Sequence, residues 1–247
     1  MMKNIFYQMK HGTELLNYGR DRIMDSVLRY AGARKAKRLS ILDIGAGSGD
    51  DLLGCAKALA GHGVESELCA IEGYAPNVQK LKERQITVVP LDIENDRFQY
   101  DDKQFDVVIM NLCLEHTKEV FHIFGEISRV LKPNGICIIG VPNLASLHNR
   151  LLLCLGKQPT SIRMFGPHVR GICKDDFIEF AEKNGYFRCV EFYGSNFYPF
   201  PPKISTVLSK YFPSLSVSIF FVLKRTNKKG SFSDILEETF FETPYKK

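Results

Sequence analysis

The sequence predicts a doubly wound α/β domain with a mostly parallel seven-stranded sheet, helices on both faces and an antiparallel last strand. Three observations support this. Short, strongly apolar runs recur between residues 39 and 143, and segments of helical period separate them. The runs are apolar almost throughout, which is typical of parallel strands buried on both faces. At 247 residues, we expect one domain.

The first half of the chain supplies five expected strands, at 39–44, 68–72, 86–89, 105–110 and 136–141. Helices are expected between them at 50–60, at 76–84 and around 120–131. In the last of these, Val120, Phe124, Ile127 and Leu131 recur at intervals of three and four residues, which places them on one helix face. Strands and helices therefore alternate as they do in βαβ units.

The pattern loosens after Pro142. Residues 144–173 mix apolar and basic residues with glycine and proline, which predicts a short helix and an irregular excursion. A helix is expected at 174–184, and the last two strands at 187–193 and 217–223. An aromatic and proline-rich stretch, 196–214, interrupts them. We thus expect a helical cap (1–38), a core (39–143), insertions at 144–173 and 196–215, and a disordered tail (230–247).

Charge and cysteine usage exclude several classes of protein. Lys and Arg number 33 against 28 Asp and Glu, and the basic run at 34–38 is interpreted as a solvated helix end, so no nucleic-acid partner is expected. The seven cysteines show no CxxC spacing, which indicates free thiols in a reducing compartment and predicts no metal site. We see no signal-peptide pattern and no apolar run of roughly 18 residues, so a cytoplasmic protein without stable membrane insertion is expected.

Three glycines, Gly45, Gly47 and Gly49, stand between the first strand and the following helix. Glycine lets the backbone turn tightly and lets a ligand approach closely, at the crevice where open parallel sheets bind nucleotides. A dinucleotide fingerprint would need glycine at position 50, which is Asp50, and Asp51 follows it. Two carboxylates oppose a diphosphate, so the loop favours a cationic ligand over NAD.

The core also resembles the class I S-adenosylmethionine-dependent methyltransferases, whose domain is Rossmann-like. The matching motifs, in order, are Leu42-Asp43-Ile44-Gly45-Ala46-Gly47-Ser48-Gly49, Glu72, Leu91-Asp92-Ile93, Phe105-Asp106-Val107-Val108, Leu114-Glu115-His116 and Arg129-Val130-Leu131-Lys132-Pro133-Asn134-Gly135. Together they cover residues 39–143, and their combination is far more specific than any one of them.

The resemblance implies that S-adenosyl-L-methionine is the cofactor. The residues it places at the cofactor are Asp43, Gly45, Ala46, Gly47, Gly49, Glu72, Gly73, Asp92, Ile93 and Asn111. Glu72 would accept hydrogen bonds from the ribose hydroxyls and Asp92 from the adenine amino group, while Asp43 would orient the loop or meet the ammonium group. Tyr18 and Arg20 would lie on an N-terminal helix that closes over the cofactor.

The acceptor is expected to be a small molecule or a saccharide, methylated at oxygen by in-line displacement. Such a displacement needs a base only when the acceptor atom carries a proton. The candidates are Glu115, His116 and His168, and we assign catalytic roles to the two histidines. The insertions would lie on the acceptor side, where Tyr198 and Phe200 could stack on a ring, as could Tyr211.

Three other classes stay open at this stage: a catalytically silent binding subunit, a nucleotide-binding oxidoreductase and a nucleic-acid-modifying enzyme. The missing glycine at position 50 counts against the second. The third is disfavoured because Asn111-Leu112-Cys113-Leu114, and not an Asn-Pro-Pro-Tyr-type motif, follows the fourth strand. The oligomeric state is left open.

Overall fold

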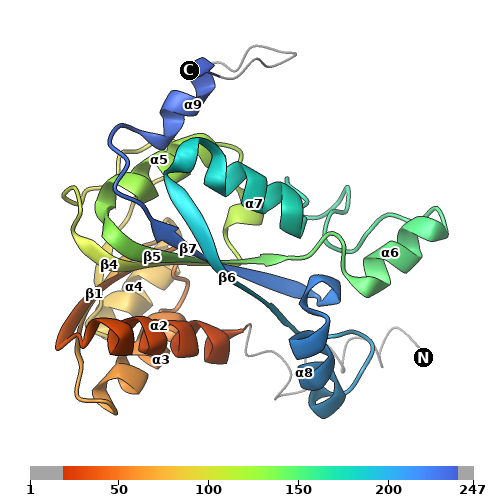
Figure 1. The fold of residues 1–247 in the computed structure, drawn as a ribbon, viewed down its shortest axis with the longest axis horizontal. Coiled ribbons are helices and arrows are strands. Elements are labelled where there is room, and N and C mark those ends of the chain that lie inside the picture. The colour runs from red at the N-terminus through yellow and green to blue at the C-terminus, as the bar shows by residue number, and fades with distance from the viewer. Residues whose placement is uncertain (1–18, 239–247) are drawn as a thin grey trace.

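Seven strands pair in the order β3-β2-β1-β4-β5-β7-β6 in the computed structural model, which describes residues 19–238 (Figure 1). The strands are β1 (Arg38–Ile44), β2 (Glu65–Ile71), β3 (Thr87–Val89), β4 (Phe105–Asn111), β5 (Leu131–Pro142), β6 (Phe187–Ser195) and β7 (Ser218–Arg225). The pairs from β3 to β5 are parallel, and β7 lies antiparallel to both β5 and β6. The predicted fold class is confirmed.

Helices cover both faces of this sheet (Figure 1). They are α2 (Arg20–Arg34), α3 (Asp50–Ala60), α4 (Ala75–Glu83), α5 (Val120–Val130), α6 (Leu147–Cys154), α7 (Lys174–Glu182), α8 (Pro202–Tyr211) and the short α9 (Ile235–Glu238). Helices α2, α3 and α4 lie on one face and α5 and α7 on the other, while α6 and α8 lie together at one end of the sheet (Figure 1). No helix within residues 19–238 has both the length and the apolar character needed to cross a bilayer.

Each face of the sheet has its own apolar core. On one side, Ile23 of α2 and Leu52 of α3 pack with Phe220 of β7, and all three side chains are buried. The other side is aromatic: Phe124 of α5 contacts Phe177 of α7, whose ring centroid lies 6.0 Å away. The central strands lie between these two cores, which explains why their residues are apolar at nearly every position.

Three sequence expectations differ from the structure. Residues 131–135, expected as a helix end and a link before the strand at 136–141, belong to β5; Asn134 has a φ of 64°, and the pairing with β4 shifts register between Phe105 and Val107. The stretch 196–214, expected only as an interruption between the last two strands, contains the ten-residue helix α8. It begins at Pro202, and proline is well tolerated in a first helical turn because its missing N–H would have no partner there.

The expected disordered tail is only partly outside the described structure. Residues 232–234 form the short 3-10 helix η4, where Phe232 is fully buried against Phe124 and Asp234 completes a capping box with Ser231. This buried aromatic ring anchors a segment that its polar composition predicted to be unstructured. Residues 235–238 form α9, while residues 239–247 of the expected tail and Tyr18 lie outside the described residues.

Hydrogen bonds to the Asp106 carboxylate join β1, β4 and β5 at the edge of the sheet opposite the glycine loop. Asp106 of β4 accepts hydrogen bonds from the Ser40 backbone N–H (3.0 Å) and from Lys132 Nζ of β5 (2.7 Å). Burial raises the pKa of Asp106, but the bonds from Lys132 and Ser40 outweigh it and hold this pKa below its usual range. The charged form of Asp106 is therefore the one that stabilises the fold.

We predict that Asp106→Asn lowers the free energy of unfolding at neutral pH by about 1 kcal/mol, a value discounted because Lys132 is partly exposed. Because the pKa of Asp106 is lower in the folded state, its stabilisation is fully present above the unfolded pKa of 3.8. This stabilisation is lost as pH falls through the folded-state pKa. Urea unfolding as a function of pH should thus show the two proteins converging below pH 3.8. The exposed Asp101→Asn is the control, and a pH-independent difference would contradict the account.

Candidate functional site

The glycine loop between β1 and α3 turns back on the sheet. Gly45, with a φ of 70°, donates its N–H to the Ile71 carbonyl of β2 (2.8 Å), and a Cβ there would lie only 2.5 Å from Cys113 Sγ. Gly47 has a φ of 55°, and a Cβ there would meet nothing within 4 Å. The first position requires glycine for both space and conformation; the second leaves the backbone open to an approaching ligand.

Glu72, directly after β2, holds this loop in place. Its Oε2 accepts the N–H of Gly47 (2.7 Å), and its Oε1 accepts the N–H of Tyr74 (2.8 Å). The side chain is nearly buried, at 9% exposure. Because a carboxylate has about four lone-pair positions, it keeps acceptor capacity for a ligand after both bonds are made.

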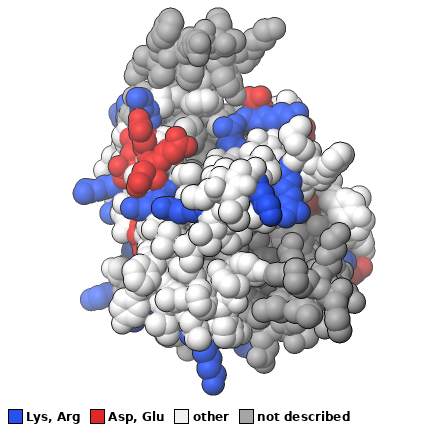
Figure 2. Space-filling view, turned by 90° about the vertical axis from the view of Figure 1, so that its right-hand side faces the viewer, with Lys and Arg blue, Asp and Glu red and all other residues white. Residues whose placement is uncertain are grey.

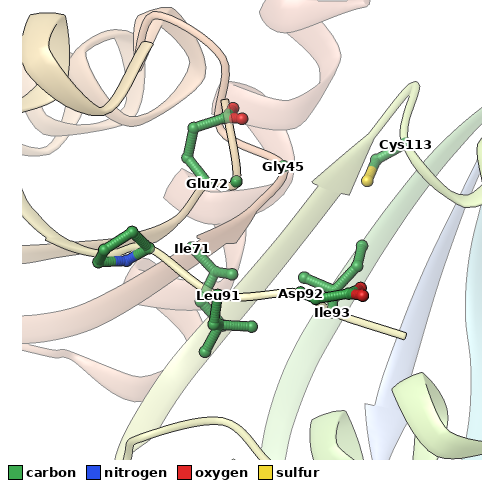
Figure 3. A pocket seen from close by; sticks show the side chains of 9 residues that line it. Gly45, Ile71, Glu72, Leu91, Asp92, Ile93 and Cys113 are labelled. Atoms are coloured by element: carbon green, nitrogen blue, oxygen red, sulfur yellow. The ribbon is translucent and has the colours of Figure 1, made fainter. Parts of the chain in front are cut away.

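A cavity of about 510 Å³ opens beside Glu72 (Figure 3). Its lining residues are Gly45, Ile71, Glu72, Gly73, Pro90, Leu91, Asp92, Ile93 and Cys113. Five of these, Gly45, Glu72, Gly73, Asp92 and Ile93, are positions that the sequence predicted at the cofactor. Ile71, Pro90 and Leu91 adjoin predicted positions in the chain, whereas Cys113 comes from the end of β4 and gave no signal in the sequence.

Asp92 lies at the exposed rim of the cavity after β3. Its Oδ1 accepts the Glu94 N–H (2.9 Å), and its Oδ2 accepts Asn95 Nδ2 (2.7 Å). The bond from Asn95, with that from Glu94, lowers the pKa of Asp92, so the carboxylate stays charged. Asp92 thus combines the turn-capping role with a place on the cavity wall.

The other predicted positions lie in or behind the loop and not among the cavity's lining residues: Asp43, Ala46, Gly47, Gly49 and Asn111. Asp43, at the end of β1, is 2% exposed. Burial raises its pKa well above the usual range, and the nearby charges of Asp51 and Glu72 add to the effect. A cation bound near the loop would stabilise the charged form of Asp43.

Arginines neutralise the two acids at the start of α3. Asp50 contacts Arg84 (2.6 Å) and Arg20 (3.4 Å), and Asp51 contacts Arg20 (3.0 Å). Asn111 also donates to Asp51 (2.9 Å). In the sequence these two carboxylates counted against a diphosphate, but in the structure each is paired with arginine. The acidic character of the site therefore comes mainly from Glu72 and Asp43.

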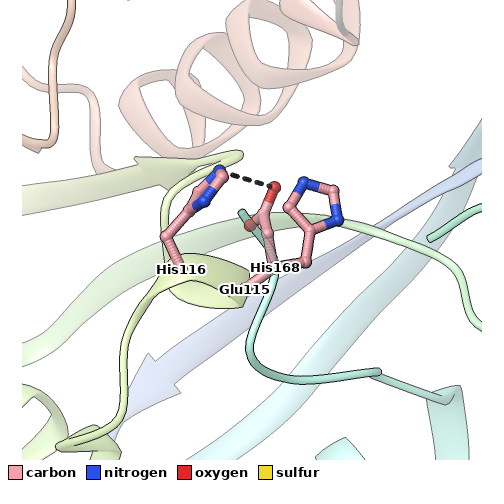
Figure 4. Close-up of side chains that lie close together, drawn as sticks. All are labelled: Glu115, His116 and His168. Carbon is pink, nitrogen blue, oxygen red and sulfur yellow. Dashed lines mark ion pairs between the residues drawn. The ribbon is translucent and has the colours of Figure 1, made fainter. Parts of the chain in front are cut away.

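Beyond Cys113, two segments bring three polar side chains together (Figure 4). Glu115 and His116 come from the 3-10 helix η1 (Leu114–His116), and His168 comes from the loop before α7. The rings of His116 and His168 lie 4.8 Å apart edge to face, and His116 Nε2 lies 3.9 Å from Glu115 Oε1. Backbone N–H groups of Val169 and Arg170 donate to the Glu115 carbonyl, which fixes the two segments to each other.

Burial sets the protonation of this cluster. It raises the pKa of Glu115 to about 7. It lowers the pKa of His116, as does the neighbouring His168, while a bond to the Pro167 carbonyl partly offsets the effect. A neutral His116 imidazole therefore lies beside an almost fully buried carboxyl group. The sequence predicted all three as base candidates, but it could not show that they converge.

The three aromatic side chains expected at the acceptor are exposed: Tyr198 by 37%, Phe200 by 40% and Tyr211 by 70%. Tyr198 meets the His148 ring edge to face at 5.4 Å, and this contact joins the two insertions. At this exposure, Tyr211 is not part of the packed core.

Comparisons with known proteins agree with this geometry. A family model described as a methyltransferase domain matches residues 16–186. A SAM-dependent methyltransferase from Archaeoglobus fulgidus has a similar fold, with a TM-score of 0.57 and 17% identity over 90% of this chain and 99% of that one. None of the curated proteins compared with this chain matches it.

Two further solved structures share the fold. The 1,6-didemethyltoxoflavin-N1-methyltransferase of Burkholderia thailandensis, solved with bound 1,6-didemethyltoxoflavin and S-adenosylhomocysteine, has a TM-score of 0.54 and 13% identity, covering 91% of this chain and 87% of that one. The DszA carbon methyltransferase has a TM-score of 0.61 and 18% identity, covering 88% and 56%. At these identities they show the fold alone. With the family model covering most of its length, the chain belongs to the methyltransferase domain family, as its glycine loop predicted.

Proposed function

We propose that the protein transfers a methyl group from S-adenosyl-L-methionine to a hydroxyl oxygen of a small-molecule or saccharide acceptor. The cofactor, when bound, supplies a methyl group on a sulfonium, whose sulfur is a good leaving group in an in-line displacement. The protein's part is to bind both reactants, align them, exclude water and manage the acceptor's proton.

The cavity residues fit this cofactor. Glu72 retains acceptor capacity for two ribose hydroxyls after its bonds to Gly47 and Tyr74. Ile71, Leu91 and Ile93 provide apolar walls for an adenine ring, and Asp92 stands at the rim for the amino group. The open side of Gly47 and the buried carboxyl of Asp43 suit the cationic methionine portion.

The cluster of Glu115, His116 and His168 is the observation that supports an oxygen acceptor. Glu115 and His116 follow the cavity residue Cys113 by two and three positions in the chain, and His168 joins them from the loop before α7. A hydroxyl must lose its proton when it is methylated, whereas a neutral amine can attack first. Structural neighbours named for carbon and nitrogen methylation share the fold, so the fold does not decide the acceptor atom.

The cofactor assignment predicts that Glu72→Ala weakens binding of S-adenosylhomocysteine by about 1 to 3 kcal/mol, because hydrogen bonds to a charged group are lost. Titration calorimetry measures this directly. Glu83→Ala, at the end of α4, is the matched control and should bind like the unchanged protein. NAD should produce no heat of binding. NAD binding as tight as that of S-adenosylhomocysteine would rule out the assignment.

The oxygen assignment predicts an ether product. With a ¹³C-methyl cofactor and a panel of phenols, monosaccharides and their amino analogues, the labelled carbon should correlate across oxygen to the acceptor carbon in NMR spectra. His116→Gln, which keeps a polar side chain, should lower kcat by about 100-fold or more with little change in cofactor affinity. Label on nitrogen, or an unaffected kcat, would contradict the assignment.

A further inference from the structure

The side chains of Glu115, His116 and His168 are arranged as metal ligands are. Their candidate ligand atoms all lie within 4.8 Å of one another. Two atoms that bind one ion at ~2.1 Å lie about 3 to 3.4 Å apart in tetrahedral or octahedral geometry. The His116 side chain is 41% exposed, and we expect its ring to rotate when an ion binds, which would shorten these distances.

Backbone carbonyls orient both imidazoles. His116 Nδ1 contacts the Pro167 carbonyl (3.3 Å), and His168 Nδ1 contacts the Ser161 carbonyl (2.7 Å). A carbonyl only accepts, so each Nδ1 carries the hydrogen and each Nε2 carries the lone pair. A second partner that fixes the tautomer in this way is a regular feature of metal-binding histidines.

Glu115 supplies the independent observation. Its side chain is 3% exposed, and Oε2 is buried without a hydrogen-bond partner among the described residues. A buried carboxylate oxygen without a partner is costly, since it has lost water and gained nothing. Glu115 Oε1 faces His116, so a cation held by this carboxylate and the two histidines would offset part of that cost.

We propose that Glu115, His116 and His168 bind a divalent first-row transition metal ion. Two imidazole nitrogens and one carboxylate form a set that suits such ions better than Mg²⁺, which prefers oxygen ligands. Three protein ligands leave coordination positions open for an acceptor. This site departs from the sequence expectation of no metal, which considered only cysteine spacing.

The role of the ion rests on the proposed oxygen methylation; its binding does not. An acceptor hydroxyl bound to the ion would be more acidic and would give its proton to solvent water. The resulting oxygen would form the new C–O bond as the S–CH₃ bond breaks. The electron pair of the broken S–CH₃ bond would remain on the leaving sulfur. The histidines would then act through the ion and not as direct proton acceptors.

The test is Co²⁺ binding to chelator-treated protein without a histidine tag, followed by calorimetry and visible absorption. One ion per chain is expected, with absorption bands of low-symmetry Co²⁺. Glu115→Gln, His116→Gln and His168→Asn should each weaken binding by at least about 100-fold, beyond the range for outer-shell partners. The exposed His62→Gln should leave binding unchanged, and unfolding temperatures without metal should be equal across the set.

Co²⁺ binding that is absent, or equal in the Glu115→Gln and unchanged proteins, would overturn the site. Two activity measurements separate it from the proposed function. If chelator-treated protein methylates oxygen as fast as metal-loaded protein, the ion has no role in the reaction and the proposed function stands. Specific Co²⁺ binding with label found only on nitrogen or carbon would keep the site and reject the function.

A second inference rests on a different feature, the composition of the two insertions. Residues 144–173 and 196–215 contain no Asp or Glu. Their six basic residues are all exposed: Arg150, Lys157, Arg163, Arg170, Lys203 and Lys210. The charged Lys and Arg side chains of the two insertions are therefore not neutralised by any Asp or Glu within the insertions themselves.

The same insertions hold most of the exposed apolar surface. Among the described residues, the large apolar side chains that are exposed all belong to the insertions, apart from Tyr74 and Val190. Met164 is 93% exposed and Phe165 fully exposed at the tip of one insertion, and Ile204 and Val207 of α8 are about half exposed. Figure 2 views this side: it is broadly uncharged with scattered basic side chains, and acidic ones gather at the upper left.

Hydrogen bonds keep the two insertions side by side. Asn143 Nδ2, directly before the first, donates to the carbonyls of Ser214, near the end of the second, and of Ser216, directly after it (both 2.8 Å). We infer that they form one docking face for an anionic lipid surface. Apolar side chains would enter the headgroup layer while the basic ones pair with lipid charges.

Sedimentation with vesicles tests this inference. The protein should pellet with vesicles of phosphatidylcholine and phosphatidylglycerol in equal parts, but neither with pure phosphatidylcholine nor in high salt. Lys203→Glu with Lys210→Glu should weaken binding by at least about tenfold, at about 1 kcal/mol per charge. Met164→Ser with Phe165→Ser should also weaken it, whereas Lys57→Glu and Val190→Ser should not.

Equal binding by all these variants would overturn the inference, as would no binding to anionic vesicles. The face could instead join two copies of this chain. Light scattering would then show a dimer that Met164→Ser with Phe165→Ser disrupts, without vesicle binding, and that outcome also rejects the lipid surface.

Discussion

The hydrogen bond from Gly47 to Glu72 is the interaction on which the candidate cofactor site depends. It joins the loop after β1 to the end of β2, two segments separated by a complete helix and strand. Because parallel strands end at the same edge, their loops meet there, and one carboxylate can hold the glycine backbone while facing the cavity. The turn of Gly45 against Cys113 then places the end of β4 on the opposite wall.

Electrostatics at this edge are divided between structural and ligand-facing charges. Arg20 and Arg84 neutralise the acids that begin α3, so that pair of charges stabilises the helix start and its packing against α2. Within residues 19–238, neither Glu72 nor Asp43 has an arginine at ion-pair distance. These two acids, more than Asp50 and Asp51, therefore favour a cationic ligand.

The fold and the cavity wall could be predicted because each follows from a local pattern. Buried parallel strands are apolar throughout, and Glu72 and Asp92 are polar residues placed where such strands end. Features that depend on tertiary contacts could not be predicted. Phe232 looks like part of a polar tail until Phe124 is seen to cover it, and α8 begins with prolines that suggest a loop. Likewise, no spacing relates Glu115 to His168, 53 residues further on.

His168 connects the chemistry of the site to the surface of the insertions. The loop that holds it carries Met164 and Phe165 at its exposed tip, and Ser161 at its base fixes the His168 ring. Movement of the tip would therefore move an imidazole that belongs to the cluster. If this face docks on a lipid surface, the docked loop is the one that carries His168 of the cluster. An acceptor held at that surface would then lie close to side chains that the Ser161 and Glu115 carbonyls already hold in place.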